Sequence, residues 1–387
     1  MARLTIEEIP LGDRRLREFV AVPWRIHRGD PHWTPPLQGD LLGSRLLGLT
    51  GLLTPAHPYH ETAEVTHFLA RNGSRLVGRI SAAINHRYNE HHRANLGFFG
   101  FYESAPEYAV TEGLLDSARA WLAKHGVDAM RGPGGYSNAT HESHQAVLVR
   151  GFDTPPTVEL THNPPYYGEH LERYGLRKVK DYHAYWIPAT ESADPRLERL
   201  VEAARRRRGI ETRPLDMRRL VDEVQNIVHV YNEAWAANWG FLPITKPEAE
   251  ALAKSLKTIA DPELVRFAYV GGELAAMIGA IPDPNVVLKP TWNRVLDLDL
   301  VRAVRLLAGR RRIRTARVMF FGICPPYRKM GVDGVLFHEV LTIAWRKGYR
   351  AGEASMLLEE NDLILRAAAM MGGVLHKTWR IYEMPIL

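Results

Sequence analysis

An internal repeat with a period of about 198 residues is the feature that most constrains the fold of this 387-residue chain. A short apolar segment that begins at Phe68 and turns at Gly73 resembles a second one that begins at Phe267 and turns at Gly272. Apolar runs on both sides of a glycine-containing turn are typical of β-hairpins. A fixed period in a chain of this length predicts two copies of one supersecondary unit.

Three further elements repeat in the same order. The apolar run 96–101 matches 318–323, and each run is followed by a stretch with apolar residues at helical spacing. The closing elements begin at Asn163 and at Asn361, and each leads into another apolar run. Each half therefore reads as a hairpin, a third strand, a helix, a strand, a helix and a last strand. Strands that alternate with helices predict the α/β (α+β) class, with a mixed sheet flanked by helices.

The boundary between the copies is expected in the polar, proline-containing segment 190–195, which precedes a charged helical stretch. We predict an N-terminal domain over 1–192 and a C-terminal domain over 193–387, each with a mixed, mostly antiparallel sheet. The composition suits two globular cores, because 45% of the residues are hydrophobic and 24% are charged. The single cysteine, Cys324, excludes an intramolecular disulfide and is typical of a reducing compartment.

The charge balance is mildly basic, with 50 Lys and Arg against 44 Asp and Glu. That balance suits an anionic partner but selects none. The arginine runs 205–208 and 310–312 come with no zinc-finger, RNP or helix-turn-helix pattern, so we do not expect nucleic-acid binding. The first residues lack the apolar segment of a signal peptide, and no apolar run reaches membrane-spanning length. We therefore expect a cytoplasmic protein.

The sharpest chemical motif is the glycine-containing loop 326–337, which follows a predicted strand and opens a predicted helix. Glycines there expose backbone N–H groups at a helix N-terminus, which attracts anions. Arg328 and Lys329 add positive charge. The loop resembles the Gln/Arg-x-x-Gly-x-Gly/Ala pattern of the GNAT N-acyltransferase superfamily, in which it holds the pyrophosphate of coenzyme A. Asp333 departs from that pattern, so either Gly334 takes over the close approach or the donor is an acyl carrier protein.

The resemblance implies acyl-CoA as donor and a primary amine as acceptor. In GNAT chemistry the amine attacks the thioester directly, and the enzyme positions the reactants and helps to deprotonate the ammonium. It implies that the following residues bind the donor: Ile323, Cys324, Arg328, Lys329, Met330, Gly331, Val332, Asp333, Gly334 and Asn361. Cys324 as a covalent nucleophile is the weaker interpretation, since a single cysteine is more often a small core residue.

The candidate acid and base lie after the next predicted strand, 354–358, which ends at Glu359. The family often has a tyrosine on the following helix as general acid, but this chain has Ala367, Ala368 and Ala369 there. The acid is therefore missing or supplied elsewhere. The interpretation of Glu359 as base competes with that of an exposed acid at the end of a strand.

Two other polar clusters could serve the acceptor. One is the segment 136–144, which lacks zinc-ligand spacing, so we expect no metal; a plain polar loop is its alternative interpretation. The other is the aromatic-rich segment 231–240. The candidate catalytic residues are Glu359, Glu142, His144 and Tyr231. The candidate substrate-binding residues are Asn138, His141, Tyr166, Tyr167, Glu233 and Asn238.

Two leucine-rich insertions, 41–53 and 286–317, suit an interfacial helix, a long-chain pocket or simple packing. Together with segments 22–36, 151–167 and 232–241, the Asp333 variant resembles a bacterial GNAT-like family that includes ceramide synthases. That resemblance implies transfer of a long-chain acyl group to a sphingoid base, with peripheral contact to the inner membrane face. Two alternatives stay open: an aminoacyl transferase of the Fem type, which uses aminoacyl-tRNA, and a non-catalytic binding protein.

Overall fold

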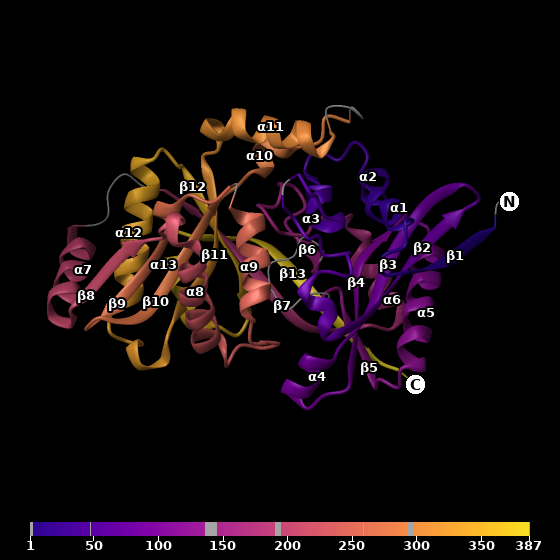
Figure 1. Ribbon diagram of the computed structural model, residues 1–387, viewed down its shortest axis with the longest axis horizontal. Coiled ribbons are helices and arrows are strands. Elements are labelled where there is room, and N and C mark those ends of the chain that lie inside the picture. The colour runs from indigo at the N-terminus through magenta and orange to yellow at the C-terminus, as the bar shows by residue number, and fades with distance from the viewer. Residues whose placement is uncertain are drawn as a thin grey trace. The chain divides into compact units, whose positions relative to one another are not determined.

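The computed structural model describes residues 3–46, 48–135, 145–189, 195–257, 259–292 and 297–386. It forms two compact units, whose elements are labelled in Figure 1. Unit 1 comprises Met1–Tyr182, Leu288–Leu307 and Lys377–Leu387, and unit 2 comprises His183–Val287 and Ala308–His376. The strands β7 (Arg177–Pro188) and β13 (Val374–Pro385) have residues in both units. The predicted domains 1–192 and 193–387 were defined by the repeat in the sequence, not by packing, and this division stays a prediction.

The sheet of unit 1 has the strand order β1-β2-β3-β4-β5-β13, and β6 pairs with β13. Neighbouring strands are antiparallel except β4 and β5, which are parallel. The strands are β1 (Leu4–Pro10), β2 (Ala63–Asn72), β3 (Arg75–Asn85), β4 (Leu96–Ser104), β5 (Ala129–Gly132) and β6 (Val147–Arg150). The helices are α1 (Leu16–Ala21), α2 (Pro23–Ile26), α3 (Gln38–Leu42), η1 (Pro58–Glu61), α4 (His86–His92), α5 (Tyr108–Lys124), α6 (Tyr166–Tyr174) and α11 (Asp299–Gly309), whose last two residues belong to unit 2.

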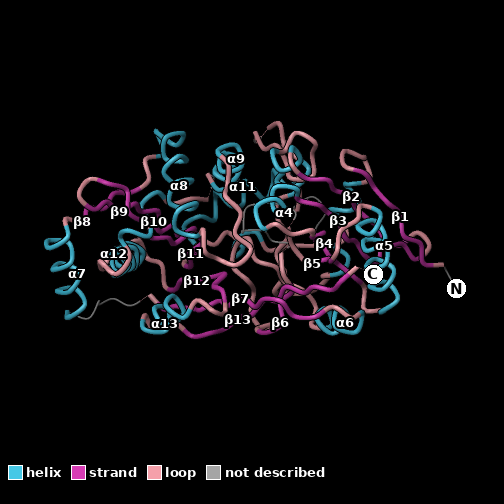
Figure 2. The backbone as a smooth tube through the Cα atoms, turned by 90° about the horizontal axis from the view of Figure 1, so that it is seen from below, coloured by secondary structure: helices cyan, strands magenta, loops and turns pink. Residues whose placement is uncertain are grey.

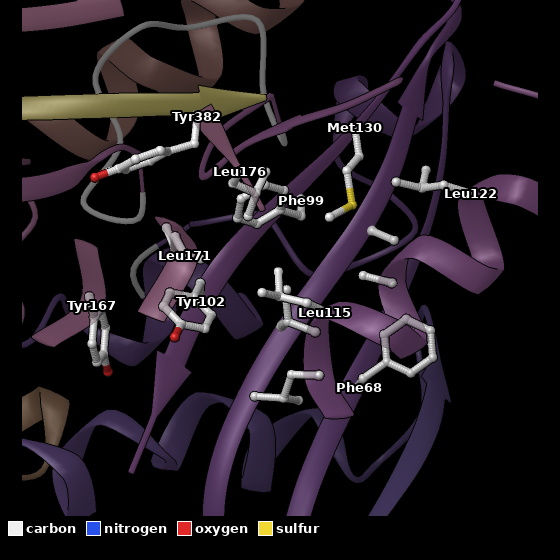
Figure 3. Packing of buried hydrophobic residues seen from close by; sticks show 14 of the residues in the cluster. Phe68, Phe99, Tyr102, Leu115, Leu122, Met130, Tyr167, Leu171, Leu176 and Tyr382 are labelled. Carbon is white, nitrogen blue, oxygen red and sulfur yellow. The ribbon is translucent and has the colours of Figure 1, made fainter. Parts of the chain in front are cut away.

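Apolar clusters cover both faces of this sheet. Successive side chains along a strand point to opposite faces, so neighbouring residues belong to different clusters. Phe68 and Phe99 belong to the cluster on one face, with Leu115 of α5 (Figure 3). Leu69 and Phe98 belong to the cluster on the other face, which includes residues of α1. The near-continuous apolar runs of these strands follow from this double burial.

The sheet of unit 2 has the order β12-β11-β10-β9-β8, which can be followed in Figure 2. In this run β11 and β12 are parallel, and the other neighbouring strands are antiparallel. Its strands are β8 (Ile210–Pro214), β9 (Val265–Val270), β10 (Glu273–Pro282), β11 (Thr315–Ile323) and β12 (Ala351–Leu358). Its helices are α7 (Pro195–Arg208), η2 (Met217–Arg219), α8 (Leu220–Trp235), α9 (Lys246–Leu256), η3 (Pro262–Leu264), η4 (Arg310–Arg312), η5 (Pro325–Tyr327), α12 (Val332–Arg346) and α13 (Asp362–Met370), and α10 (Asn285–Leu288) ends one residue beyond it.

Strand β11 lies between two helices. The Phe320 ring is 6.4 Å from that of Trp235 on α8, and the Phe321 ring is 4.5 Å from that of Phe337 on α12. Adjacent residues of a strand point to opposite faces, so α8 and α12 cover opposite faces of the strand. Trp235 also donates its indole N–H to the Phe321 carbonyl at 2.8 Å, which fixes α8 on β11.

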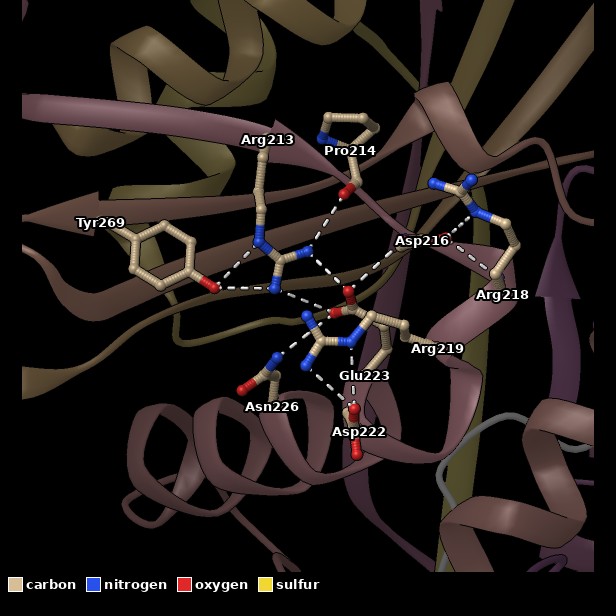
Figure 4. Close-up of polar contacts among 9 residues, drawn as sticks. All are labelled: Arg213, Pro214, Asp216, Arg218, Arg219, Asp222, Glu223, Asn226 and Tyr269. Carbon is tan, nitrogen blue, oxygen red and sulfur yellow. Dashed lines mark hydrogen bonds and ion pairs between the residues drawn. The ribbon is translucent and has the colours of Figure 1, made fainter.

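An ion pair between the half-buried Arg213 and the buried Glu223 fixes the other end of α8 (Figure 4). Arg213 of β8 donates to both carboxylate oxygens of Glu223, at 2.6 and 3.1 Å, and to the Tyr269 hydroxyl at 2.8 Å. Glu223 is 3% exposed. A bidentate arginine–carboxylate pair in this setting is strong and directional, so α8 is held at both ends.

The observed order confirms the predicted repeat. The elements β2-β3-β4-α5-β5-α6-β7 recur as β9-β10-β11-α12-β12-α13-β13. The leucine-rich insertion 286–317 includes most of α10 and all of α11 and η4. None of the described helices is both long and apolar enough to cross a bilayer.

Candidate functional site

The parallel strands β11 and β12 separate at their carboxyl ends. Their register runs only from Thr315↔Ala351 to Val318↔Ala354, although β11 continues to Ile323 and β12 to Leu358. Beyond these pairs the two backbones no longer pair with each other. Free strand edges of this kind can hydrogen-bond an extended ligand.

The loop after β11 ends in a helix start without a side-chain cap. Gly331 is the N-cap of α12 with φ +83°, and it has no side chain that could cap the first turn. Glycine adopts this left-handed conformation without the steric cost that a Cβ brings. The first amides of α12 and the helix dipole therefore offer partial positive charge to an anion.

The space beside this helix start fits a phosphate group. A Cβ added at Gly334 would meet no atom within 4 Å, so packing within the protein does not require a glycine there. A glycine keeps that surface open for a close ligand. Lys329, in a left-handed conformation at φ +63°, and Asp333 are both exposed around it. The residues present thus fit the pyrophosphate of coenzyme A, with Asp333 as the one opposing charge.

Arg328 points back to the protein rather than out of the loop. Its Nε donates to the Ile323 carbonyl at 3.2 Å and its Nη2 to the Ala234 carbonyl at 2.9 Å. It therefore ties the end of β11 to α8, and its charge remains beside the loop.

Cys324 is a core residue in this structure, with 3% exposure. Burial raises the pKa of its thiol, and the carboxylate of Glu233 raises it further. A nucleophilic cysteine needs the opposite shift, toward the thiolate. The structure thus supports the packing interpretation of this residue.

The residues at the end of β12 have distinct places. Glu359 lies in the turn after β12 and is partly buried. Asn361 caps α13, because its side-chain oxygen accepts the Ile364 N–H at 3.5 Å. Of the alanines on α13, Ala368 is buried, 1% exposed.

The predicted residues of α8 and the loop after it do not converge. Tyr231 is 2% exposed and packs its ring against Trp235 and Phe241. Glu233 is exposed on the same helix. The backbone N–H of Asn238 donates to the Trp235 carbonyl in the turn that ends α8. Tyr231 is therefore a core residue, while Glu233 is the member that lies near Cys324.

Tyr166 and Tyr167 lie in unit 1, at the end of β4. Tyr167 donates its hydroxyl to Glu103 at 2.7 Å and accepts the Ser104 amide at 2.9 Å. Tyr166 donates to the Ser104 carbonyl at 2.7 Å. Burial raises the pKa of both phenols, so both stay protonated donors. Asn138, His141, Glu142 and His144 lie outside the described residues.

Sequence reasoning missed a buried polar chain in unit 2. Arg317 donates to the Ser355 hydroxyl at 3.0 Å, Ser355 donates to Glu353 at 2.8 Å, and Glu353 pairs with His376 at 2.8 Å. Arg317 and Glu353 are fully buried and lie opposite each other in the sheet, one residue before β11 and β12 separate. The signal that could have revealed them is a charged residue inside each of two apolar strands. Among the described residues no group of His, Cys, Asp or Glu could hold a metal ion.

Comparison with known proteins now identifies the family. The bacterial ceramide synthase of Caulobacter vibrioides is 33% identical over 380 residues, covering 95% of this chain and 94% of that protein. The chain belongs to the bacterial ceramide synthase family. Protein YghO of Escherichia coli is 28% identical and covers 97% of this chain and 94% of its own. No protein-family model matches the chain.

Solved structures show the fold of this family member. A tandem GNAT protein from the clavulanic acid biosynthesis pathway covers 100% of this chain and 99% of its own, with a TM-score of 0.55 and 12% identity. A glucosamine N-acetyltransferase region of a fungal multi-domain β-N-acetylglucosaminidase has a TM-score of 0.56 and 13% identity, covering 99% of this chain and 38% of its own. The predicted tandem GNAT fold is confirmed. With the ceramide synthase relative, it establishes an acyltransferase of the tandem GNAT type.

Proposed function

We propose that this chain transfers a long-chain acyl group from acyl-CoA to the primary amine of a sphingoid base. The observation that carries the proposal is the open, glycine-built start of α12 beside the separated ends of β11 and β12. The relative named bacterial ceramide synthase supports the choice of acceptor.

Each part of the site has a role in this reaction. Bound acyl-CoA supplies the thioester carbonyl. The amides of α12 around Gly331 and Gly334, with Lys329, would bind its pyrophosphate. The unpaired edges of β11 and β12 would hold the pantetheine arm, and Glu359 would accept a proton from the amine directly or through water. Positioning of the two reactants is the main contribution of such a site.

The exposed face of α11 suggests how the chain would reach a lipid acceptor. Leu300, Val304 and Leu307 are each 58% exposed, and the preceding Leu298 is 56% exposed. Exposed arginines 310–312 follow the helix directly. An apolar stripe next to a basic cluster is typical of helices that lie in the interface of an anionic membrane. We therefore propose peripheral membrane contact through α11.

The decisive experiment measures free-thiol release from short-chain to long-chain acyl-CoAs, with sphinganine and 3-ketosphinganine as acceptors and mass spectrometry of the products. We expect amide with long-chain donors only, and its loss in Gly331→Trp. Gly126→Trp controls for the left-handed backbone, since Gly126 has φ +71°; an added Cβ would meet no atom within 4 Å there, whereas at Gly331 it would meet Ala204 at 3.2 Å. The control should keep activity.

Other results would point elsewhere. Turnover with acyl carrier protein but not with acyl-CoA would replace the donor. A requirement for aminoacyl-tRNA would favour a Fem-type transferase. Binding of acyl-CoA without turnover of any amine would favour a binding protein.

A further inference from the structure

Unit 1 contains a polar pocket of about 510 Å³ to which the proposed acyl transfer assigns no role. Its walls come from α1 and the residues before it, from α3 and the loop after it, from the turn 53–55 and from the first residue of α11, all labelled helices of Figure 1. Seven of the fourteen lining residues have polar or charged side chains. A pocket of this size can hold a small ligand, and such a lining suits a polar ligand better than an acyl chain.

Backbone contacts hold the walls of the pocket together. Asp299 of α11 accepts the backbone N–H groups of Gln38 and Gly39, at 3.0 and 2.6 Å, and so ties α11 to the first turn of α3. Gly43 and Gly51 lie so close that a Cβ added at Gly51 would be 2.0 Å from the Gly43 nitrogen. The loop after α3 therefore packs directly on the turn that follows it, and the pocket is formed by the protein alone.

Two guanidinium groups of the lining are left for a ligand. Arg14 and Arg17 are exposed, and neither side chain makes a hydrogen bond or an ion pair with any residue that the structure describes. The Arg17 backbone N–H donates to the Arg14 carbonyl at 3.3 Å, so a single turn of the chain carries both side chains. Arginine suits phosphate because its planar guanidinium donates two parallel hydrogen bonds to it.

The two acids of the lining already have partners within the protein. Asp13 accepts the backbone N–H of Arg15 at 2.8 Å and its Nη2 at 2.7 Å. Both oxygens of Asp299 accept amides of α3, and Asp299 also attracts the buried guanidinium of Arg302. Because the acids are satisfied and the two arginines are not, the pocket matches an anion rather than a cation.

The pocket adjoins the exposed apolar face of α11. Asp299 lines the pocket and is the first residue of that helix. Leu298 before it is 56% exposed, and Leu300 after it is 58% exposed. A lipid held in the pocket by an anionic head group would have its acyl chains beside this face, as in other interfacial helices that bind anionic membranes.

We propose that this pocket binds a glycerol phosphate through the guanidinium groups of Arg14 and Arg17. Two sources supply this chemistry: the head group of phosphatidylglycerol and soluble glycerol 3-phosphate. The Gln38 carboxamide and the Thr54 hydroxyl oxygen line the same pocket and offer hydrogen bonds to the glycerol hydroxyls. The proposal is independent of the acyl donor, and it uses the proposed membrane contact of α11 only for the lipid source.

The first test titrates the full chain with glycerol 3-phosphate by isothermal titration calorimetry, with glycerol as the uncharged match. We expect saturable binding of the phosphate ester only, about tenfold or more weaker in the double variant Arg14→Gln with Arg17→Gln, because two charged donors are lost. Arg25→Gln with Arg28→Gln is the matched control, since these arginines are also exposed and three residues apart but do not line the pocket. Equal losses in the two double variants would overturn the inference.

A second pair of substitutions separates a specific site from general attraction. Arg14→Lys with Arg17→Lys keeps both charges but loses the two parallel donors of each guanidinium, so its affinity should lie between those of the wild type and the glutamine variant. Since this variant keeps charge and most of the side-chain stem, it also serves if the glutamine variant folds poorly. Wild-type affinity in both the lysine and the glutamine variants would overturn the inference.

Flotation with phosphatidylglycerol vesicles distinguishes the two sources. If the lipid is the ligand, the glutamine variant of Arg14 and Arg17 loses vesicle binding relative to its matched control. A variant with Leu300, Val304 and Leu307 changed to Gln then loses vesicle binding too, but keeps its affinity for glycerol 3-phosphate. If the soluble ester is the ligand, the arginine variant floats like its control and only the calorimetry changes. Arginine-dependent binding to neither probe would overturn the inference.

The last step separates this pocket from the proposed donor site, because acyl-CoA also carries phosphates. Gly331→Trp should leave glycerol 3-phosphate binding unchanged, since Gly331 belongs to unit 2 and the pocket to unit 1. Loss of that binding in Gly331→Trp would assign the phosphate to the donor loop and overturn the inference. If acyl-CoA acylates no amine but glycerol phosphate binding needs the two arginines, the proposed function fails and the pocket stands. If acyl-CoA turns over and the arginine variant binds both probes as the wild type does, the pocket fails and the proposed function stands.

Discussion

The two repeats differ most where the fourth strand of the copy passes into its helix. In unit 2, β11 leads through Gly331 into α12, and the first turn stays open to an anion. In unit 1, β4 leads into α5, whose N-cap is Glu107, a carboxylate where an anion would bind. Glu103, at the end of β4, is 12% exposed at its side chain and pairs with His27. The same scaffold thus presents an anion site in one copy and an acid–base cluster in the other.

The next helix shows the same division. In unit 1 Tyr166 and Tyr167 of α6 hydrogen-bond the end of β4. In unit 2 the equivalent helix, α13, carries Ala367–Ala369. The tyrosine hydroxyls bond the backbone of Ser104 at the end of β4, which alanine side chains cannot do at the end of β11. Loss of the tyrosines and presence of the glycine loop therefore go together.

The largest expected effect tests the buried charges of both copies. Arg79→Met should destabilise the protein by about 3–5 kcal/mol, because it removes a buried guanidinium and one charged partner of the Glu103 carboxylate, which is 12% exposed. Arg79 is 5% exposed and lies 3.8 Å from Glu103. Arg317→Met should cost a similar amount through Glu353. Urea denaturation measures both.

The double variant Arg79→Met with Glu103→Gln is the control. It removes the charge along with its partner, so it should regain part of the lost stability. Equal losses in the single and double variants would show that packing of Arg79 between the rings of Phe19 and Phe101, rather than charge, sets its contribution.

The second prediction concerns acid sensitivity of unit 1. Burial lowers the pKa of His67 from its ordinary 6.5 to about 3. Below pH 6.5 the unfolded chain binds a proton that the folded chain excludes, so the free energy of unfolding falls as pH falls toward 3. The slope is about 1.4 kcal/mol per pH unit, or roughly 2.7 kcal/mol between pH 6.5 and 4.5.

His67→Gln should remove this contribution, because glutamine can donate to the Ile9 carbonyl that His67 Nδ1 contacts at 3.2 Å but does not titrate. The readout is the slope of unfolding free energy against pH in urea titrations. An unchanged slope would contradict the prediction. His86→Gln, at an exposed histidine, controls for the loss of an imidazole.

The sequence predicted the fold through its repeat, since hairpins at Gly73 and Gly272 and the order of elements require only local patterns. It also predicted the α12 loop, because a glycine between a strand and a helix has a local physical meaning. It could not predict that the chain's last residues, Lys377–Leu387, belong to unit 1 and complete its sheet by pairing with β5. Strand pairing between residues far apart in the chain leaves no local signal.

The site was predicted unevenly for the same reason. Asn361 was taken for a ligand residue, and its cap on α13 needs the helix start to be known. His27, Glu103, Asp30 and His162 come from three segments and meet only in the folded unit. Their one local trace is a charged residue, Glu103, at the end of an apolar strand.

The third prediction tests α11. Changing Leu300, Val304 and Leu307 together to Gln should weaken binding to vesicles that contain anionic phosphatidylglycerol by about tenfold or more, because their apolar area no longer enters the interface. Stability should change little, since all three side chains are exposed. Flotation with phosphatidylglycerol and phosphatidylcholine vesicles measures the effect.

The matched control changes three exposed aliphatic residues of unit 2, Leu200, Val221 and Leu363, which are 67%, 62% and 80% exposed. It removes a comparable apolar area from scattered positions. Equal loss in both triples would mean that general surface hydrophobicity, not α11, drives vesicle binding.

The smallest expected effect concerns the one residue that departs from the donor-loop pattern. Asp333 is exposed in the first turn of α12, where it opposes a pyrophosphate. Two like charges about 4 Å apart in water repel by about 1 kcal/mol, so Asp333→Asn should tighten acyl-CoA binding about fivefold. Isothermal titration calorimetry at low salt measures this gain. The loss of a favourable charge at the helix N-terminus should cost about 0.3–1 kcal/mol of stability.

Asp362→Asn separates the two effects, because Asp362 occupies the first turn of α13 and is 74% exposed at its side chain. It should cost the same stability without changing acyl-CoA affinity. Tighter binding in Asp333→Asn alone would mean that the pyrophosphate lies at the α12 loop despite the departure. If neither variant binds acyl-CoA more tightly, the charge at 333 does not face a pyrophosphate, and a donor held by its carrier protein becomes the better explanation of the aspartate.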